Sequence, residues 1–161
     1  MIPSMWRVEL LHPLFVHFPI ALLVIGSLLR LPGIWFPQVL FASRLMVVLG
    51  SAFAWAAYFT GNMAEEEVNS TMCDPGATHW HGDLAFYVTL LFTAVALIDL
   101  LSVWLARKRP WLASMRLQMA LLVPLLAGAG LMAYVGHLGA SLVYQQGAAV
   151  YKPSPECKEF E

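Results

Sequence analysis

The sequence predicts an all-α integral membrane protein, a four-helix bundle of antiparallel up-down topology with both termini outside. Of its 161 residues, 60% are hydrophobic and 12% are charged, and the mean hydropathy is +0.69. Soluble domains carry about 25% charged residues. Four apolar segments are each long enough to cross about 30 Å of hydrocarbon. None alternates polar and apolar residues as a barrel strand does, so we expect helices.

The segments lie in a single domain, residues 1–161, with helices at about 10–31, 39–60, 81–106 and 115–146. The first and third connections are short, which makes sequential helices antiparallel neighbours. The second connection, residues 61–80, is polar and is expected to be an outer loop. Residues 151–161 are expected to form a polar outer tail.

The basic residues predict the orientation, because positive charges are retained on the cytoplasmic side. One side of the predicted bundle carries Arg30, Arg44, Arg107, Lys108, Arg109 and Arg116, and the other carries Arg7, Lys152 and Lys158. The loop at 61–80 and both termini should therefore be outside. The net charge of −1 gives no indication of nucleic-acid binding.

The two cysteines, Cys73 and Cys157, lie in no C-x-x-C or C-x-x-C-H pattern, so there is no signal for a zinc knuckle or covalent haem. The predicted topology places both on the same outer, oxidising side, where a disulfide can join them. Two free thiols are equally consistent with the sequence.

The histidines are the main indication of function, and all of them fall in the outer half of the predicted bundle. They are His12, His17, His79, His81 and His137. Polar residues at membrane depth usually face the bundle interior and serve a function, and imidazole is the commonest metal ligand. His79, in polar sequence, and His12, beside Pro13 in a first helical turn, are also explained as interfacial residues.

Small residues share faces of two predicted helices. Gly50, Ala54, Ala57 and Gly61 lie on one face of the second helix, where close helix packing is the better explanation. In the fourth helix the shared face comprises Gly130, Ala133, His137 and Ala140, and Gly136 precedes the histidine. Because a histidine is part of this face, a slot for a flat cofactor explains it as well as packing does.

A b-type haem accounts best for these features, because it needs one or two axial imidazoles and apolar walls. We expect His17 and His81 as the axial pair, with His137 at the haem edge or as a reserve ligand. His12 with His137 would serve a second haem. The alternatives are zinc held by His17, His81 and His137, copper, and no cofactor. No catalytic residue is predicted.

One acid, Asp99, lies deep in an apolar segment, and Arg44 lies at comparable depth in the second helix. A structural ion pair between them is favoured over a proton-relay role for the acid.

Four stretches of the sequence carry a resemblance to a known family. They are His12-Pro13-Leu14-Phe15-Val16-His17-Phe18-Pro19, Thr60-Gly61, His81-Gly82-Asp83-Leu84-Ala85 and Gly136-His137-Leu138-Gly139-Ala140-Ser141-Leu142-Val143-Tyr144. The chain resembles the bacterial membrane family catalogued as domain of unknown function 2231 over about residues 10–150. It departs from the family pattern at Ala140, where a second Gly is usual. The resemblance implies a four-helix domain of the bacterial inner membrane, sometimes joined to c-type cytochromes.

The motifs and the resemblance together predict a small membrane-anchored electron-transfer protein rather than an independent enzyme. One or two b-type haems near the periplasmic face would exchange electrons with quinone, a c-type cytochrome or another redox subunit. The alternatives are a non-catalytic anchor or assembly subunit and a copper- or metal-handling membrane protein.

The predicted orientation can be tested at the two cysteines. A membrane-impermeant thiol reagent added to reduced, intact cells should modify Cys73 and Cys157 from the outside. Both cysteines lie in segments opposite the basic, cytoplasmic ends of the predicted helices. Labelling only in inverted vesicles would show that the protein has the opposite orientation. Mass spectrometry of oxidised protein would show the loss of two hydrogen atoms if the thiols are bridged.

Overall fold

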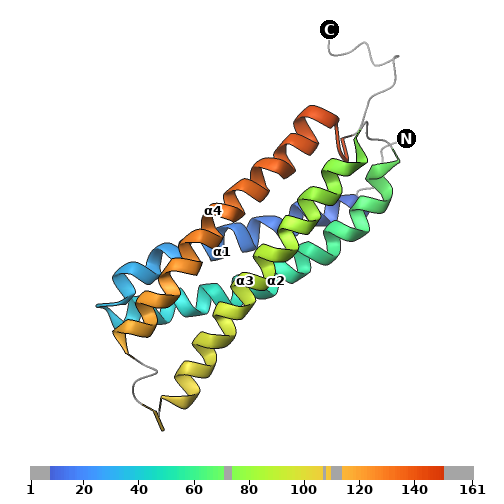
Figure 1. Ribbon diagram of the computed structural model, residues 1–161. Coiled ribbons are helices and arrows are strands. Elements are labelled where there is room, and N and C mark those ends of the chain that lie inside the picture. The colour runs from blue at the N-terminus through green and yellow to red at the C-terminus, as the bar shows by residue number, and fades with distance from the viewer. Residues whose placement is uncertain (1–7, 71–73, 107, 110–113, 151–161) are drawn as a thin grey trace.

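Four long helices make up almost all of the protein. The computed structural model describes residues 8–70, 74–106, 108–109 and 114–150. A short 3-10 turn, η1 (Val8–Leu10), leads into α1 (Leu11–Gly33), α2 (Pro37–Asn69), α3 (Pro75–Leu105) and α4 (Met115–Gln146) (Figure 1). The described ranges contain no strand, and all four helices are long and apolar enough to cross a membrane. The all-α fold with four candidate spans is thus confirmed.

The polar segment at 61–80 is mostly helical, so the loop expected there is wrong. α2 continues to Asn69 and α3 already begins at Pro75. The run Glu65-Glu66-Glu67 consists of good helix formers, which extend α2 beyond its apolar part. The predicted disulfide partners Cys73 and Cys157, and the tail at 151–161, lie outside the described residues.

The start of α3 is fixed by its capping residues. The Asp74 side chain accepts a hydrogen bond from the Gly76 backbone N–H at 3.0 Å, and Pro75 occupies the first helical position. His79 consequently lies in α3, where its Nδ1 is 2.9 Å from Oε1 of Glu65 on α2. This contact is exposed on the His79 side, so it adds little stability.

The apolar core runs along the axis of the bundle. Leu23, Val47, Phe92 and Leu125, one from each helix, are all completely buried. The small-residue face of α2 serves close packing, as expected, because a Cβ at Gly50 would lie 2.7 Å from the Leu23 side chain. Large apolar side chains outside this core are exposed on every helix, which suits a lipid environment.

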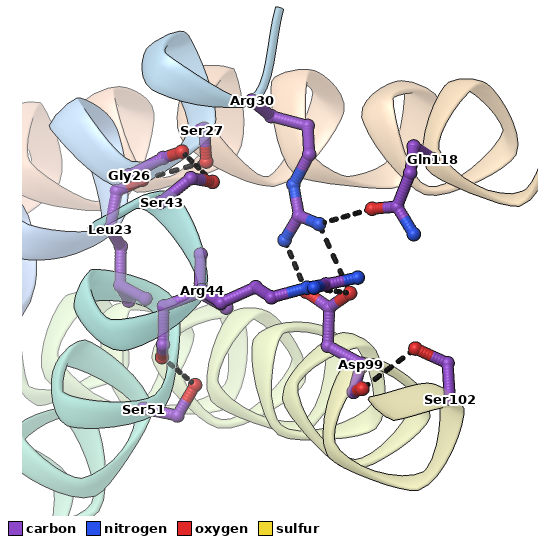
Figure 2. Close-up of polar contacts among 11 residues, drawn as sticks. Leu23, Gly26, Ser27, Arg30, Ser43, Arg44, Ser51, Asp99, Ser102 and Gln118 are labelled. Atoms are coloured by element: carbon purple, nitrogen blue, oxygen red, sulfur yellow. Dashed lines mark hydrogen bonds and ion pairs between the residues drawn. The ribbon is translucent and has the colours of Figure 1, made fainter. Parts of the chain in front are cut away.

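A buried polar cluster joins all four helices at the end where α1 finishes and α2 begins (Figure 2). Arg30 of α1 is 0% exposed and forms a two-point ion pair with Asp99 of α3, including an Nη1–Oδ1 contact of 3.0 Å. Its Nη1 also donates to Oε1 of Gln118 on α4 at 2.8 Å. Arg44 of α2 reaches the same carboxylate, with Nε 3.4 Å from Oδ1.

The expected pairing of Asp99 with Arg44 is therefore confirmed, but Arg30 is the closer partner. In the sequence, Arg30 is one of the basic residues near a helix end. In the structure it turns inward, because an unpaired carboxylate in the bundle interior would be costly.

We expect Asp99→Ala to lower the free energy of unfolding by about 3–5 kcal/mol, because removing one partner of a buried ion pair leaves an uncompensated charge. Denaturant unfolding in mixed micelles measures this change. Asp83→Ala is the matched control, an exposed acid on the same helix, and should change stability by less than about 0.5 kcal/mol. Equal stability of the two variants would show that the cluster does not hold the helices together.

Candidate functional site

Two histidines face each other at the end of the bundle opposite the Arg30–Asp99 cluster. His12 lies in the first turn of α1 and His81 in the second turn of α3. Their ring centroids are 6.2 Å apart, and the ring planes are nearly perpendicular at 88°. Both rings are partly buried. Two imidazoles from helices far apart in sequence therefore share one interior site.

The His12 ring is fixed by the backbone of α2. Its Nδ1 lies 2.8 Å from the carbonyl oxygen of Ala57. A carbonyl can only accept, so Nδ1 carries the proton and donates, and Nε2 of the neutral ring keeps a free lone pair. This is the arrangement by which proteins orient a metal-binding imidazole.

The His81 ring has one nitrogen that is buried away from solvent. Its Nδ1 meets no partner with good hydrogen-bond geometry, although the backbone of Val135 on α4 lies within reach of the ring. Buried polar atoms are almost always paired, and an unpaired one calls for an explanation such as an ion or ligand. A bound ion or ligand would satisfy this nitrogen in place of the Val135 backbone.

Glycines on the other two helices make room for the rings. A Cβ at Gly61 of α2 would lie 3.0 Å from Nδ1 and Cε1 of His12, and one at Gly139 of α4 would lie 3.1 Å from Cε1 of His81. Each imidazole thus rests against the backbone of a neighbouring helix. Every helix of the bundle contributes one residue to this four-residue arrangement.

A cavity of about 130 Å³ adjoins the two rings. Its polar lining comes from Glu9, Tyr58, Asn62, Glu65 and Thr78, and much of the remainder is small or apolar. The volume is close to that of an engineered cavity of about 150 Å³ that accepts benzene. A ligand much larger than one six-membered ring must therefore extend past the cavity or part its walls.

His17 does not meet His81, although the sequence analysis expected these two as the axial pair. His17 is exposed, and its Nδ1 contacts the carbonyl oxygen of Pro13 in the same helix at 2.6 Å. Five residues of α-helix correspond to a rotation of about 140°. With His12 facing inward, His17 must face outward.

The face of α4 that carries His137 is also turned outward. Gly130, Ala133, His137 and Ala140 are exposed, and a Cβ at Gly130 or Gly136 would meet no atom within 4 Å. The bundle therefore forms no interior slot on this face, and a cofactor there remains a prediction. The buried face of α4 carries Leu121, Leu125, Met132 and Val135, and Gly139 extends it to the histidine pair.

Of the three histidines expected to bind zinc, only His81 lies at this site, because His17 and His137 are exposed. Among the residues that it describes, no group of three or more His, Cys, Asp or Glu side chains could hold a metal ion.

The residue spacing contains a signal for the histidine that His81 meets in the structure. Eighteen residues separate His12 from Arg30, and eighteen separate His81 from Asp99. Eighteen residues are five complete turns of α-helix, so each histidine shares a face with the charged residue farther along its helix. An inward Arg30 and Asp99 therefore require an inward His12 and His81.

Comparison with known proteins identifies the family of the chain. A family model described as "Predicted membrane protein (DUF2231)" matches residues 9–152. The chain belongs to this family. The four stretches that resemble DUF2231 proteins each supply one member of the site, in order His12, Gly61, His81 and Gly139. Searches of curated proteins and of solved structures gave no match.

Adding one methyl group at a glycine of the site should disturb it. We expect Gly61→Ala to lower the free energy of unfolding by about 1–3 kcal/mol, because the His12 ring is held by Ala57 and cannot yield freely. Gly136→Ala is the control, because the new methyl group meets open space. The higher helix propensity of Ala can raise the free energy of unfolding of this variant by up to about 1 kcal/mol. Thermal unfolding in detergent compares the two, and identical shifts would contradict tight packing at the site.

Proposed function

We propose that this protein transfers electrons in the bacterial inner membrane by binding one b-type haem between His12 and His81. The facing pair of imidazoles is the observation that carries the proposal. The space between the two ring centroids is wide enough for one metal ion held by a nitrogen of each imidazole. The observed separation is 6.2 Å.

The surroundings of each ring fit a role as an axial ligand. The Ala57 carbonyl holds Nδ1 of His12 and leaves Nε2 free, and Nδ1 of His81 is buried with no partner of good hydrogen-bond geometry. Gly61 and Gly139 let both rings lie against helix backbone, which limits their rotation. Ligands fixed in this way need little reorganisation when the oxidation state of a bound metal changes.

The cavity is smaller than a porphyrin, so the proposal requires the tetrapyrrole to extend beyond it. Gly82 lines the cavity, and a Cβ there would meet no atom within 4 Å. This side of the cavity therefore has room for a larger group. A bound haem would supply one-electron chemistry, and the chain would supply ligands and a largely apolar pocket.

The proposal includes the antiparallel topology, with both termini periplasmic. In support, the starts of α1 and α3 meet the later parts of α2 and α4 at the histidine pair. The Arg30–Asp99 cluster joins the opposite ends. Quinone in the bilayer, a c-type cytochrome or another periplasmic redox subunit would then exchange electrons at the histidine end.

A copper ion at the same two imidazoles is the second candidate, and the small cavity favours it. Imidazole suits copper, and a single ion needs no widening of the walls. An anchor or assembly role is what remains if the purified protein holds neither haem nor metal.

The visible spectrum and metal content of the purified protein test these proposals. A b-type haem should give Soret and α bands, and His12→Ala or His81→Ala should lower haem content by about tenfold or more, because each removes a direct ligand. His17→Ala and His137→Ala are matched controls, since both histidines are exposed on the same helices as site residues.

Haem loss in His17→Ala, with haem retained in His12→Ala, would contradict the assigned pair. Copper without haem, lost in the two site variants, would support the second candidate. A colourless, metal-free protein would contradict both.

A further inference from the structure

A groove of about 690 Å³ opens between α2 and α3 near the Arg30–Asp99 cluster. Figure 1 shows the last part of α3 standing apart from the start of α2. The apolar walls consist of Phe41, Leu45 and Val48 from α2 and Leu100, Val103 and Trp104 from α3. Phe41 is 67% exposed and Trp104 is 71% exposed, so these walls face the surroundings of the bundle.

Two basic residues, Arg44 and Lys108, line the same groove, and none of the described residues that line it is acidic. The Arg44 side chain is 23% exposed, and its contact with Asp99 is a long one at 3.4 Å. The Lys108 residue is exposed, just beyond the end of α3. The groove therefore combines apolar walls with a positively charged end.

The neighbouring cluster does not balance this charge. Two guanidinium groups, Arg30 and Arg44, share the single carboxylate of Asp99, and Arg30 already engages both of its oxygens. Buried donors also exceed acceptors there, because Nε of Arg30 and Nε2 of Gln118 have no hydrogen-bond partner. A charge left unpaired among membrane-spanning helices is costly, so a negative group from outside the chain would be stabilising.

We propose that this groove is a binding site for an anionic phospholipid. Its phosphodiester pairs with Arg44 and Lys108, and an acyl chain lies along the apolar walls. The volume is within the range of ligand sites, about 300–1,000 Å³. Basic pockets between membrane-spanning helices are suited to anionic head groups, and an exposed Trp near a helix end is typical of the interface. A soluble anion would leave the apolar walls unused, which is why the occupant is a lipid.

Native mass spectrometry of the full-length protein in detergent tests this site. The protein is titrated with phosphatidylglycerol or with phosphatidylcholine of identical acyl chains. We expect the protein to retain phosphatidylglycerol with about fivefold or greater preference over phosphatidylcholine. Lys108→Gln should reduce that preference by about fivefold, because one basic residue near an anionic head group raises the affinity by about this factor. Arg44→Gln should abolish the preference.

Arg116→Gln is the matched control, because it removes an exposed positive charge at the start of α4, outside the groove. It should leave the preference unchanged.

Trp104→Ala should weaken retention of both lipids equally. Lys108→Gln leaves the buried cluster intact, so the test holds even if Arg44→Gln fails to fold. No headgroup preference in the unmodified protein, or an equal effect of Arg116→Gln and Lys108→Gln, would overturn the proposal. The outcome is independent of whether haem binds at the opposite end.

Discussion

The buried ion pair between Arg30 and Asp99 sets the register of the bundle. Ion pairs of this kind add little net stability compared with apolar packing, but they penalise every arrangement that separates the two charges. A one-residue rotation of α1 would turn Arg30 by about 100° and remove it from the carboxylate. Five helical turns separate Arg30 from His12 on α1, and five separate Asp99 from His81 on α3. The contact at one end therefore also determines which side chains meet about 27 Å away. The pairing of His12 with His81 thus depends on a contact that neither histidine touches.

The sequence was sufficient to predict the class of fold, because lipid restricts a chain of this composition to apolar helices of a certain length. It was less informative about where the helices end. Hydrophobicity marks the part of α2 that lies in hydrocarbon, whereas the helix itself continues as long as residues such as Glu65 favour it. The limits of a span and the limits of a helix are set by different physical effects.

The structure departs from the sequence-based expectation mainly in which histidine of α1 faces inward. Apolar neighbours on both sides made His17 look buried, but in a membrane protein apolar neighbours also mark the surface that contacts lipid. The small residues around His137 misled for the same reason, since Gly and Ala are tolerated on an outward face. Interior faces were better marked by residues that lipid does not tolerate, such as Arg30 and Asp99. The buried nitrogen of His81 and the groove beside Arg44 depend on the packed structure and could not be foreseen from spacing.

The length of α2 has a consequence for molecules that approach the histidine end. Its 33 residues extend about 50 Å, well beyond about 30 Å of hydrocarbon. The part after Gly61 carries exposed Glu66 and Glu67, and Asp83 is exposed on the neighbouring helix. These carboxylates produce a negative electrostatic field around the entrance to the cavity, screened over about 8 Å at physiological ionic strength. Cationic molecules and positively charged protein surfaces are enriched there, while small anions are depleted, before any contact with the site is made.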